Sequence, residues 1–194
     1  MEAAPNPSAE TPRSTPPTVA GRPPCPHGGP LEFLVCPTDA ASEKIWGAAT
    51  GANAHGDSGV DLRAPVDTVV GSHTACLLDF RVKAACVCKI CGAAWAFTLA
   101  PRSSLGTKTP LIQTNSVGVI DAGYRGALKV PVLNLGGSPF SIKTGSAYFQ
   151  LLAHDLRPMG ARLADENEKN LYFSAGATAR GAGGFGSTGP GGQQ

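Results

Sequence analysis

Short apolar runs separated by turn-forming residues dominate the middle of this chain. Residues 31–35 form one such run, and Pro37 ends it as it would end a β-strand. Phe140 and Ile142 alternate with polar neighbours, which is the period of two expected for a strand with two distinct faces. Many short strands with turn signals between them predict an all-β sandwich or barrel. Further runs occupy residues 68–70, 76–82, 94–99, 117–120, 127–135 and 147–152.

No long segment has the period of a helix. Only short helical turns are expected, after Arg102 and near residues 42–46. Pro131 lies inside one of the apolar runs, and proline cannot donate a hydrogen bond to a neighbouring strand. The sequence therefore predicts an edge strand or a β-bulge at Pro131.

The two ends of the chain differ from the middle in composition. Residues 1–30 are rich in Pro, Ala, Ser and Thr and have too little apolar surface to offset the entropy cost of ordering, so a disordered arm is expected. Residues 175–194 are rich in Gly, Ala, Ser and Thr, which is typical of a flexible arm. We assign residues 31–174 to one β domain. A docking motif for an unknown protein partner could lie in residues 1–30, although composition favours a solvated arm.

Charge and hydropathy argue against two classes of partner. The net charge is only +2 and no run of Lys or Arg occurs, so no nucleic-acid-binding surface is indicated. No stretch of about 18 apolar residues could span a membrane, and the proline-rich N-terminus lacks the apolar core of a signal peptide. We expect an intracellular protein, cytoplasmic or nuclear, whose six cysteines stay reduced.

The cysteines leave a metal site open as an alternative. Cys86, Cys88 and Cys91 have the spacing C-x-C-x-x-C, with Cys76 nearby, and thiolates at such spacing can bind Zn²⁺. No second C-x-x-C pair occurs. Reduced cysteines that pack in and around a hairpin are therefore the favoured interpretation.

Two segments after apolar strands carry side chains that could act on a phosphate ester. Asp121 enters a turn, with Tyr124 three residues later, and a carboxylate there could hold and deprotonate a water molecule. An ordinary hairpin turn, with Tyr124 packed on it, explains the same residues. Arg102, Ser103 and Ser104 could bind phosphate, or a serine could cap a short helix.

The glycine-rich stretch at residues 180–189 could form a second phosphate-binding element. Successive backbone N–H groups next to glycines can surround an anion. Arg180 adds a guanidinium, Ser187 and Thr188 add hydroxyl groups, and the ring of Phe185 could stack on a base. A solvated Gly-rich tail explains this stretch equally well when it is considered alone.

Two further segments carry weaker signals. The turn at residues 56–62 offers carboxylates, Asp61 among them, that could face a hydrated Mg²⁺ or make hydrogen bonds within the turn. The turn at residues 145–150 leads into a strand and contributes one amide, that of Gln150.

The order and spacing of these segments decide between the interpretations. SGVDLRA, PRSSLG, N-x-x-GVIDAGYRG, G-x-x-x-x-QLL and RGAGGFGSTG follow one another within residues 31–189. Together they closely resemble the five motifs of the trimeric dUTPase family. The resemblance implies a jelly-roll-like, distorted β-barrel or sandwich that assembles as a homotrimer, with active sites at the subunit interfaces. It also implies Mg²⁺-dependent hydrolysis of dUTP to dUMP and pyrophosphate, which keeps uracil out of DNA and supplies dUMP.

The resemblance also implies roles for individual residues by matching position. Asp121 would hold the attacking water, and Asp61 would lie near Mg²⁺, through water. Asn115 and the strand that contains Gly118 and Ile120 would hydrogen-bond to uracil. The remaining substrate-binding residues implied by the match are Arg102, Ser103, Ser104, Tyr124, Gln150, Arg180, Phe185, Gly186, Ser187 and Thr188.

Two other functions stay open as alternatives. A dCTP deaminase shares this fold by family resemblance, but the Asp121–Tyr124 pair and the RGAGGFGSTG arm argue against it. A dUTPase-like protein-interaction module with weak or no catalysis should have eroded motifs, whereas the motifs of this chain are intact.

Overall fold

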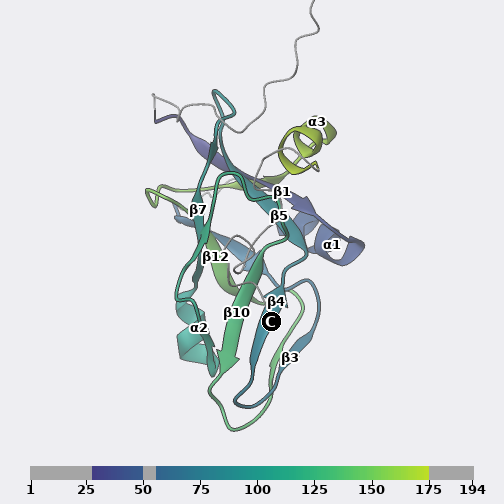
Figure 1. Ribbon diagram of the computed structural model, residues 1–194, viewed down its shortest axis with the longest axis vertical. Helices are drawn as coiled ribbons and strands as arrows, with labels where there is room; N and C mark the ends of the chain where they lie inside the picture. Colours follow the sequence, from purple (N-terminus) through teal and green to yellow (C-terminus); the bar gives the residue numbers. More distant parts are fainter. Residues whose placement is uncertain (1–27, 50–55, 175–194) are drawn as a thin grey trace, which may run out of the picture.

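The computed structural model describes residues 28–49 and 56–174, which form a mostly β protein (Figure 1). Its helices are α1 (Ala40–Ala49), α2 (Ser103–Lys108) and α3 (Glu166–Glu168), and a π-helical turn, η1 (Lys169–Phe173), follows α3. Its strands are β1 (Leu31–Pro37), β2 (Gly59–Arg63), β3 (Thr68–Val70), β4 (Ala75–Asp79), β5 (Val82–Cys88), β6 (Ala94–Trp95), β7 (Phe97–Pro101), β8 (Leu111–Gln113), β9 (Gly118–Ile120), β10 (Lys129–Asn134), β11 (Phe140–Ile142), β12 (Ala147–Ala153) and β13 (Ala161–Leu163).

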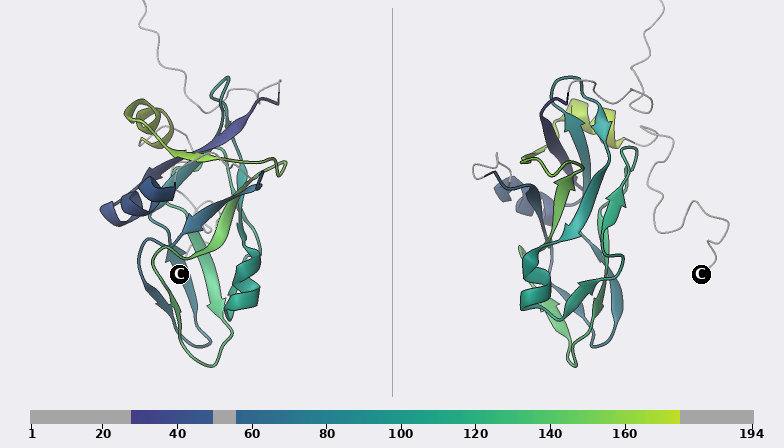
Figure 2. Two further views of the ribbon diagram at one scale, coloured as in Figure 1. Left: turned by 180° about the vertical axis from the view of Figure 1, so that it is seen from behind. Right: turned by 90° about the vertical axis from the view of Figure 1, so that its left-hand side faces the viewer.

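The strands of the described residues form four small sheets. Their orders are β13-β1-β5-β6, β4-β10-β8, β11-β3 and β2-β12-β7-β9. Neighbouring strands are antiparallel except for β1 and β13, which are parallel. Seen from the side, the strands lie in layers that face one another (Figure 2). No helix within residues 28–49 and 56–174 is long and apolar enough to cross a membrane.

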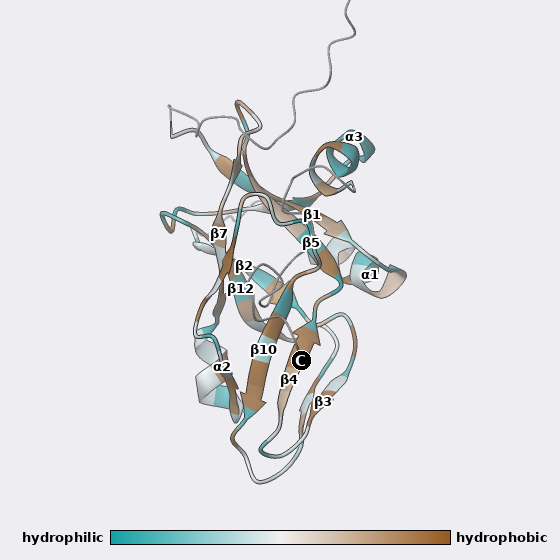
Figure 3. Ribbon diagram, viewed as in Figure 1, coloured by the Kyte–Doolittle hydropathy of each residue, from teal (hydrophilic) through white to brown (hydrophobic). Residues whose placement is uncertain are grey.

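The main core joins strands from different sheets through aromatic contacts. The ring of Phe33 on β1 meets that of Phe97 on β7 edge to face at 5.2 Å, and Phe80 meets Phe149 of β12 in the same way at 5.8 Å. Trp46 of α1 is 1% exposed and belongs to the same cluster. Figure 3 shows the apolar character of β4 and β10, which line this core. Both expected short helices are confirmed, and so are the expected strands except at residues 76–82 and 94–99, each of which contains parts of two strands.

The apolar run at residues 76–82 was predicted as one strand, and this prediction is wrong. The run contains two strands, because β4 ends at Asp79 and β5 begins at Val82. Arg81 between them has φ of 52°, a left-handed conformation that turns the chain. The Asp79 carboxylate accepts a hydrogen bond from the Arg81 backbone N–H at 2.8 Å, and an aspartate that bonds to the backbone two residues later is typical of a turn.

The prediction of an edge strand or a bulge at Pro131 is also wrong. β10, which contains Pro131, is the middle strand of its sheet and pairs with β4 without a register shift. The Pro131 carbonyl accepts from the Thr114 N–H at 3.0 Å, on the side of β8. The N–H and C=O of one residue in an antiparallel strand point the same way. The missing N–H of Pro131 therefore faces Thr114, at the end of the pairing with β8, which begins at Val132. Proline removes only the reciprocal bond at that end of the ladder.

The last described segment docks on the outer face of the β1–β5 sheet. Leu34 and Val87 on this face pack with Tyr172 and Phe173 of η1 in a second apolar cluster. Because the neighbours of Leu34 on β1 point into the main core, both faces of β1 are covered. This explains why residues 31–35 show a continuous apolar run instead of a strict alternation.

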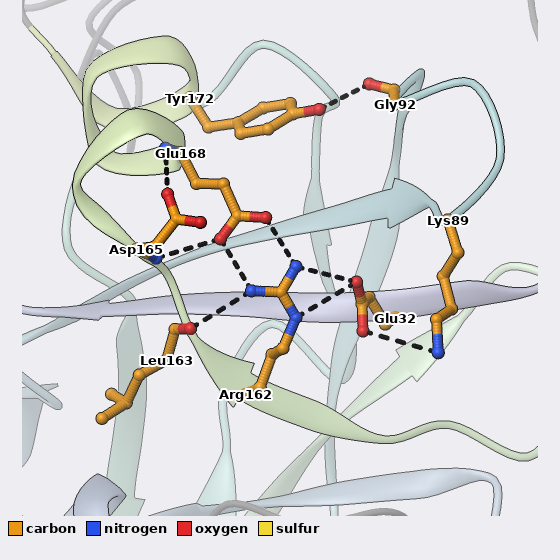
Figure 4. A network of polar contacts seen from close by, with 8 residues as sticks. All are labelled: Glu32, Lys89, Gly92, Arg162, Leu163, Asp165, Glu168 and Tyr172. Atoms are coloured by element: carbon orange, nitrogen blue, oxygen red, sulfur yellow. Dashed lines mark hydrogen bonds and ion pairs between the residues drawn. The ribbon is translucent and has the colours of Figure 1, made fainter.

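An ion-pair network holds this segment in place (Figure 4). Arg162 on β13 donates to Glu32 of β1 at 3.1 Å and to both carboxylate oxygens of Glu168 in α3. Glu168 also accepts from the backbone N–H of Asp165, whose side chain accepts from the Glu168 N–H, so a reciprocal capping box begins α3. The Arg162 guanidinium holds the pKa of Glu168 below its ordinary value of 4.5.

Replacing Glu168 with glutamine should lower stability in a pH-dependent way. The loss should be about 1 kcal/mol at pH 7, since the bidentate pair is partly screened by solvent. A carboxyl group with a lowered folded-state pKa stabilises fully above pH 4.5, and this contribution disappears as the pH falls through its folded-state pKa. Thermal melts of wild type and Glu168→Gln should therefore differ at pH 7, and the difference should shrink as the pH falls below 4.5. Glu166→Gln, at an exposed carboxylate, is the control, and an undiminished difference at pH 3 would contradict the argument.

The cysteine spacing falls on the β5–β6 hairpin. Cys86 and Cys88 are buried on β5, Cys91 lies in the turn, and none of the three forms a disulfide in the part of the chain that the structure describes. Burial raises the pKa of Cys86 to about 12. Within residues 28–49 and 56–174 no group of three or more His, Cys, Asp or Glu side chains is placed to hold a metal ion. The packing of these cysteines in and around a hairpin is as the favoured interpretation predicted.

Alkylation should separate these thiols by accessibility. At pH 8 the thiolate is the reactive form, so Cys86 and Cys88 should stay unlabelled by iodoacetamide in the folded protein and react fully in denaturant. The half-buried Cys91 should react faster than either of them under native conditions. Peptide mass spectrometry after timed labelling measures this, and rapid native labelling of Cys86 would contradict its burial.

Candidate active site

Three strands of one sheet bring the expected phosphate-binding residues together. Asp61 on β2 lies opposite Gln150 on β12, and Gln150 lies opposite Ala100 on β7. Arg102 follows β7 directly, and its Nη1 donates to Asp61 Oδ2 at 2.7 Å. We call the residues gathered here the Arg102 cluster; they are Asp61, Arg102, Ser103, Ser104 and Gln150.

Arg63 joins this cluster and was missed by the sequence analysis. Its Nη2 lies 3.4 Å from Asp61 Oδ2, and its Nη1 donates to the Gly145 carbonyl at 3.3 Å. Two guanidinium groups, those of Arg63 and Arg102, thus share one carboxylate, and their formal charges leave the cluster positive. The sequence contained a signal for Arg63, because it follows Asp61 by two residues and residues two apart on a strand point to the same face.

A tight contact explains one glycine of the first motif. Gln150 Nε2 donates to the Pro101 carbonyl at 3.2 Å, which fixes the side chain across the sheet. A Cβ atom added at Gly59 would lie only 2.0 Å from Gln150 Oε1. Any side chain at Gly59 would therefore displace Gln150 from the Arg102 cluster.

The two serines of the second motif do not cap α2. Arg102 occupies the cap position of this helix, and no side chain makes a capping hydrogen bond. The helix-cap alternative for the serines is therefore wrong. Ser103 is exposed, whereas the Ser104 Oγ is buried and has no hydrogen-bond partner among the described residues. A buried hydroxyl in this state can still donate to a ligand.

Asp121 lies in a turn that a buried arginine holds together. The Tyr124 N–H donates to the Asp121 carbonyl at 2.9 Å. Arg125 is only 4% exposed, and its Nη1 donates to the carbonyls of Ala122 at 2.8 Å and Tyr124 at 2.7 Å. Burial lowers the pKa of Arg125 from its ordinary value. Arg125 is thus a second residue that the sequence analysis missed, and it holds the turn from inside.

Tyr124 and the residues expected to bind uracil form a second group of site residues together with Asp121. The Tyr124 hydroxyl donates to the Ala127 carbonyl at 2.9 Å, which agrees with the alternative that Tyr124 packs on the turn. The position of the Tyr124 ring under a deoxyribose stays a prediction. Asn115 lies in the turn between β8 and β9, and its Oδ1 accepts from Gln113 Nε2 at 2.9 Å. β9, which contains Gly118, is the last strand of its sheet in the described part of the chain. Half of its backbone polar groups therefore face away from β7.

The structure does not bring Asp121 to the Arg102 cluster. Arg102 directly follows the last residue of β7. Asp121 lies near the opposite end of β7, because it follows Ile120, which pairs with the first residue of that strand, Phe97. A strand rises about 3.3 Å per residue, so the two ends of β7 are roughly 13 Å apart. Within one chain, a water held by Asp121 is too far away to attack a phosphate bound by Arg102. The other predicted site residues, Arg180, Phe185, Gly186, Ser187 and Thr188, lie outside the described residues, as do residues 1–27.

Comparison with known proteins gives consistent matches. Residues 48–189 match the family model described as dUTPase. The deoxyuridine 5'-triphosphate nucleotidohydrolase of Neisseria meningitidis serogroup C is 34% identical over 134 residues, 69% of this chain and 83% of that protein. The protein of the same name from Leptospira interrogans is 43% identical over 93 residues, 48% of this chain and 59% of that protein. Among solved structures, a mutant dUTPase from phage phi11 of S. aureus matches with TM-score 0.49 and 18% identity over 62% of this chain and 88% of that chain.

Proposed function

The chain belongs to the dUTPase family, and from this membership we propose that it is a dUTP diphosphatase, which hydrolyses dUTP to dUMP and pyrophosphate. The observation that carries the proposal is the Arg102 cluster, in which three family motifs meet on adjacent strands. Two arginines around one carboxylate suit a polyphosphate anion, because guanidinium groups bind phosphate oxygens in a bidentate way.

The reaction requires positioning and charge neutralisation more than covalent help. Arg102, Ser103 and Gln150 would bind the α- and β-phosphates, and the free hydroxyl of Ser104 would add a donor. The Asp121 carboxylate would accept a proton from a water molecule while the water oxygen bonds to phosphorus and the bond between the α- and β-phosphoryl groups breaks. Pyrophosphate would leave with the electron pair of that bond.

The residues of the site are compatible with Mg²⁺ that arrives with the triphosphate. Asp61 already forms ion pairs with Arg102 and Arg63, so its carboxylate is better placed to hold a metal-bound water than the ion itself. Proteins usually bind Mg²⁺ through one or two carboxylates, several waters and substrate phosphates. When bound, Mg²⁺ would supply positive charge to the phosphate oxygens.

Substrate selectivity tests the proposal directly. Release of pyrophosphate should be measured with dUTP, dTTP, dCTP and UTP at equal concentrations. We expect dUTP to be strongly preferred, because the 5-methyl of thymine and the 2′-hydroxyl of UTP would clash with the base pocket and with Tyr124. Equal turnover of all four nucleotides, or of none, would overturn it. Ammonia release from dCTP would identify a deaminase instead, and a folded protein inactive on all four would favour the interaction module.

We further propose that the active site forms between subunits of a homotrimer. The separation of about 13 Å along β7 supports this, because a second copy could bring its own Asp121 to the Arg102 cluster. The arm with Arg180, Ser187 and Thr188 would close over the γ-phosphate, and the Phe185 ring would cover the uracil, from a third copy.

Assembly and subunit mixing test the shared site. Light scattering should give a mass near three times 19.7 kDa. Arg102→Gln and Asp121→Asn should each be inactive alone, and activity should reappear when the two variants are unfolded and refolded together, since some interfaces then combine both wild-type groups. Asn115→Ala mixed with Asp121→Asn is the control, because both changes damage the same group of residues. An active monomer, or no recovery in the first mixture, would contradict the shared site.

A further inference from the structure

Gln113 is a buried polar residue that the proposed mechanism does not use. It ends β8 and is 8% exposed. Burying an amide is costly unless its polar atoms find partners. Its Oε1 is buried and has no hydrogen-bond partner within residues 28–49 and 56–174, so packing alone does not explain an amide at this position.

The hydrogen bonds of Gln113 determine its orientation. Its Nε2 lies 3.4 Å from the carbonyl oxygen of Leu99 on β7. A carbonyl oxygen can only accept, so the NH₂ end of Gln113 must face Leu99 and the Oε1 end must face away. The same nitrogen has a second hydrogen, which it donates to Asn115 Oδ1 at 2.9 Å.

The orientation of Gln113 in turn determines that of Asn115. With its Oδ1 held towards Gln113, the Asn115 amide turns its Nδ2 donors to the opposite side. A Cβ atom added at Gly118 would lie 3.7 Å from Asn115 Nδ2, so these donors lie beside the first residue of β9. This is the strand to which the base-binding role is assigned.

A site that offers donors distinguishes uracil from cytosine. At the 4-position uracil carries a carbonyl acceptor, as thymine does, whereas cytosine carries an NH₂ donor. We propose that Gln113 is a positioning residue that selects uracil over cytosine by holding Asn115 with its Nδ2 donors towards the base. The inference rests on the proposed function. Without Gln113, the Asn115 amide could rotate and present either its donors or its oxygen.

Two variants test this hydrogen-bond relay. Gln113→Met keeps the length and burial of the side chain but cannot donate. Asn115→Asp keeps the shape of the side chain and the bond from Gln113 but leaves only acceptors for the base. Thr114→Ala is the matched control, because Thr114 lies between the two residues and its side chain is exposed.

The measurement is the ratio of kcat/KM for dUTP to that for dCTP, with dCTP also tested as a competitive inhibitor in case its turnover is too slow. We expect Gln113→Met to lower this ratio about ten- to hundred-fold, the range for one mispaired buried hydrogen bond, with kcat for dUTP little changed. Asn115→Asp should shift preference towards dCTP further, and Thr114→Ala should leave the ratio unchanged.

The outcomes separate the relay from a structural role and from the proposed function. A folded Gln113→Met with the wild-type ratio would overturn the inference, as would Asn115→Asp that still prefers dUTP as strongly as wild type. If Gln113→Met does not fold, Asn115→Asp decides, because it retains Gln113. A wild-type protein that does not hydrolyse dUTP would overturn the proposed function, and this inference with it.

Discussion

Replacement of Asp121 with asparagine is expected to lower kcat by roughly 10²–10⁴, the usual contribution of a general base. The amide has the shape of the carboxylate but cannot accept a proton from water. The turn should keep its structure, because the Tyr124 N–H bonds to the backbone carbonyl of Asp121 and Arg125 bonds to other carbonyls. The KM for dUTP should therefore change little.

Steady-state kinetics and dUTP binding by calorimetry measure the two parts of this prediction. Asp79→Asn is the matched control, since Asp79 is a half-exposed carboxylate that pairs with Lys129 at 3.3 Å and lies outside both groups of site residues. A variant at Asp121 that turns over within a few-fold of wild type would show that another group activates the water.

Truncation after Ala175 is expected to abolish most catalysis while the fold survives. It removes Arg180, Phe185, Ser187 and Thr188 together. The loss should fall on kcat/KM through missing transition-state contacts, by about 10²-fold or more, the scale for one lost group that stabilises developing charge. Phe185→Ala alone should cost less, on the order of 1–3 kcal/mol for a lost aromatic stack on a base.

The fold should survive because the apolar contacts that hold the end of the described chain are retained. Tyr172 and Phe173 stay in the second cluster against Leu34, and the Tyr172 hydroxyl still donates to the Gly92 carbonyl at 2.7 Å. Circular dichroism and light scattering on the truncated protein provide the control. A folded truncation that hydrolyses dUTP at the wild-type rate would show that residues 176–194 are only a solvated tail.

Much of the β architecture could be predicted because period and turn chemistry are local properties. The alternation around Phe140 and Ile142 identified β11, and an apolar run at residues 147–152 identified most of β12. Predictions from local sequence failed where pairing with a distant segment decided the position of a strand. Pro131 lies in a middle strand at the end of the β10–β8 pairing, which begins at Val132, and no local pattern contains that fact.

The short elements at the end of the described chain escaped prediction for a related reason. β13 has three residues, and α3 and η1 are too short to show a helical period. Arg162 holds these elements against β1 through its ion pair with Glu32, which is 130 residues away in sequence. A contact of this kind exists only after the chain has folded.

The sequence by itself determined the family, the order of the motifs and the residue types that chemistry requires, because these are properties of a linear string. Only the tertiary structure decided which of these groups meet. Asp61, Arg102 and Gln150 converge because antiparallel pairing places β2, β12 and β7 side by side. Asp121 is kept apart by the length of β7. Arg63, Gln113 and Arg125 gain their roles from partners that strand register and turn packing supply, and hydrogen bonds of that kind depend on distance and direction in space.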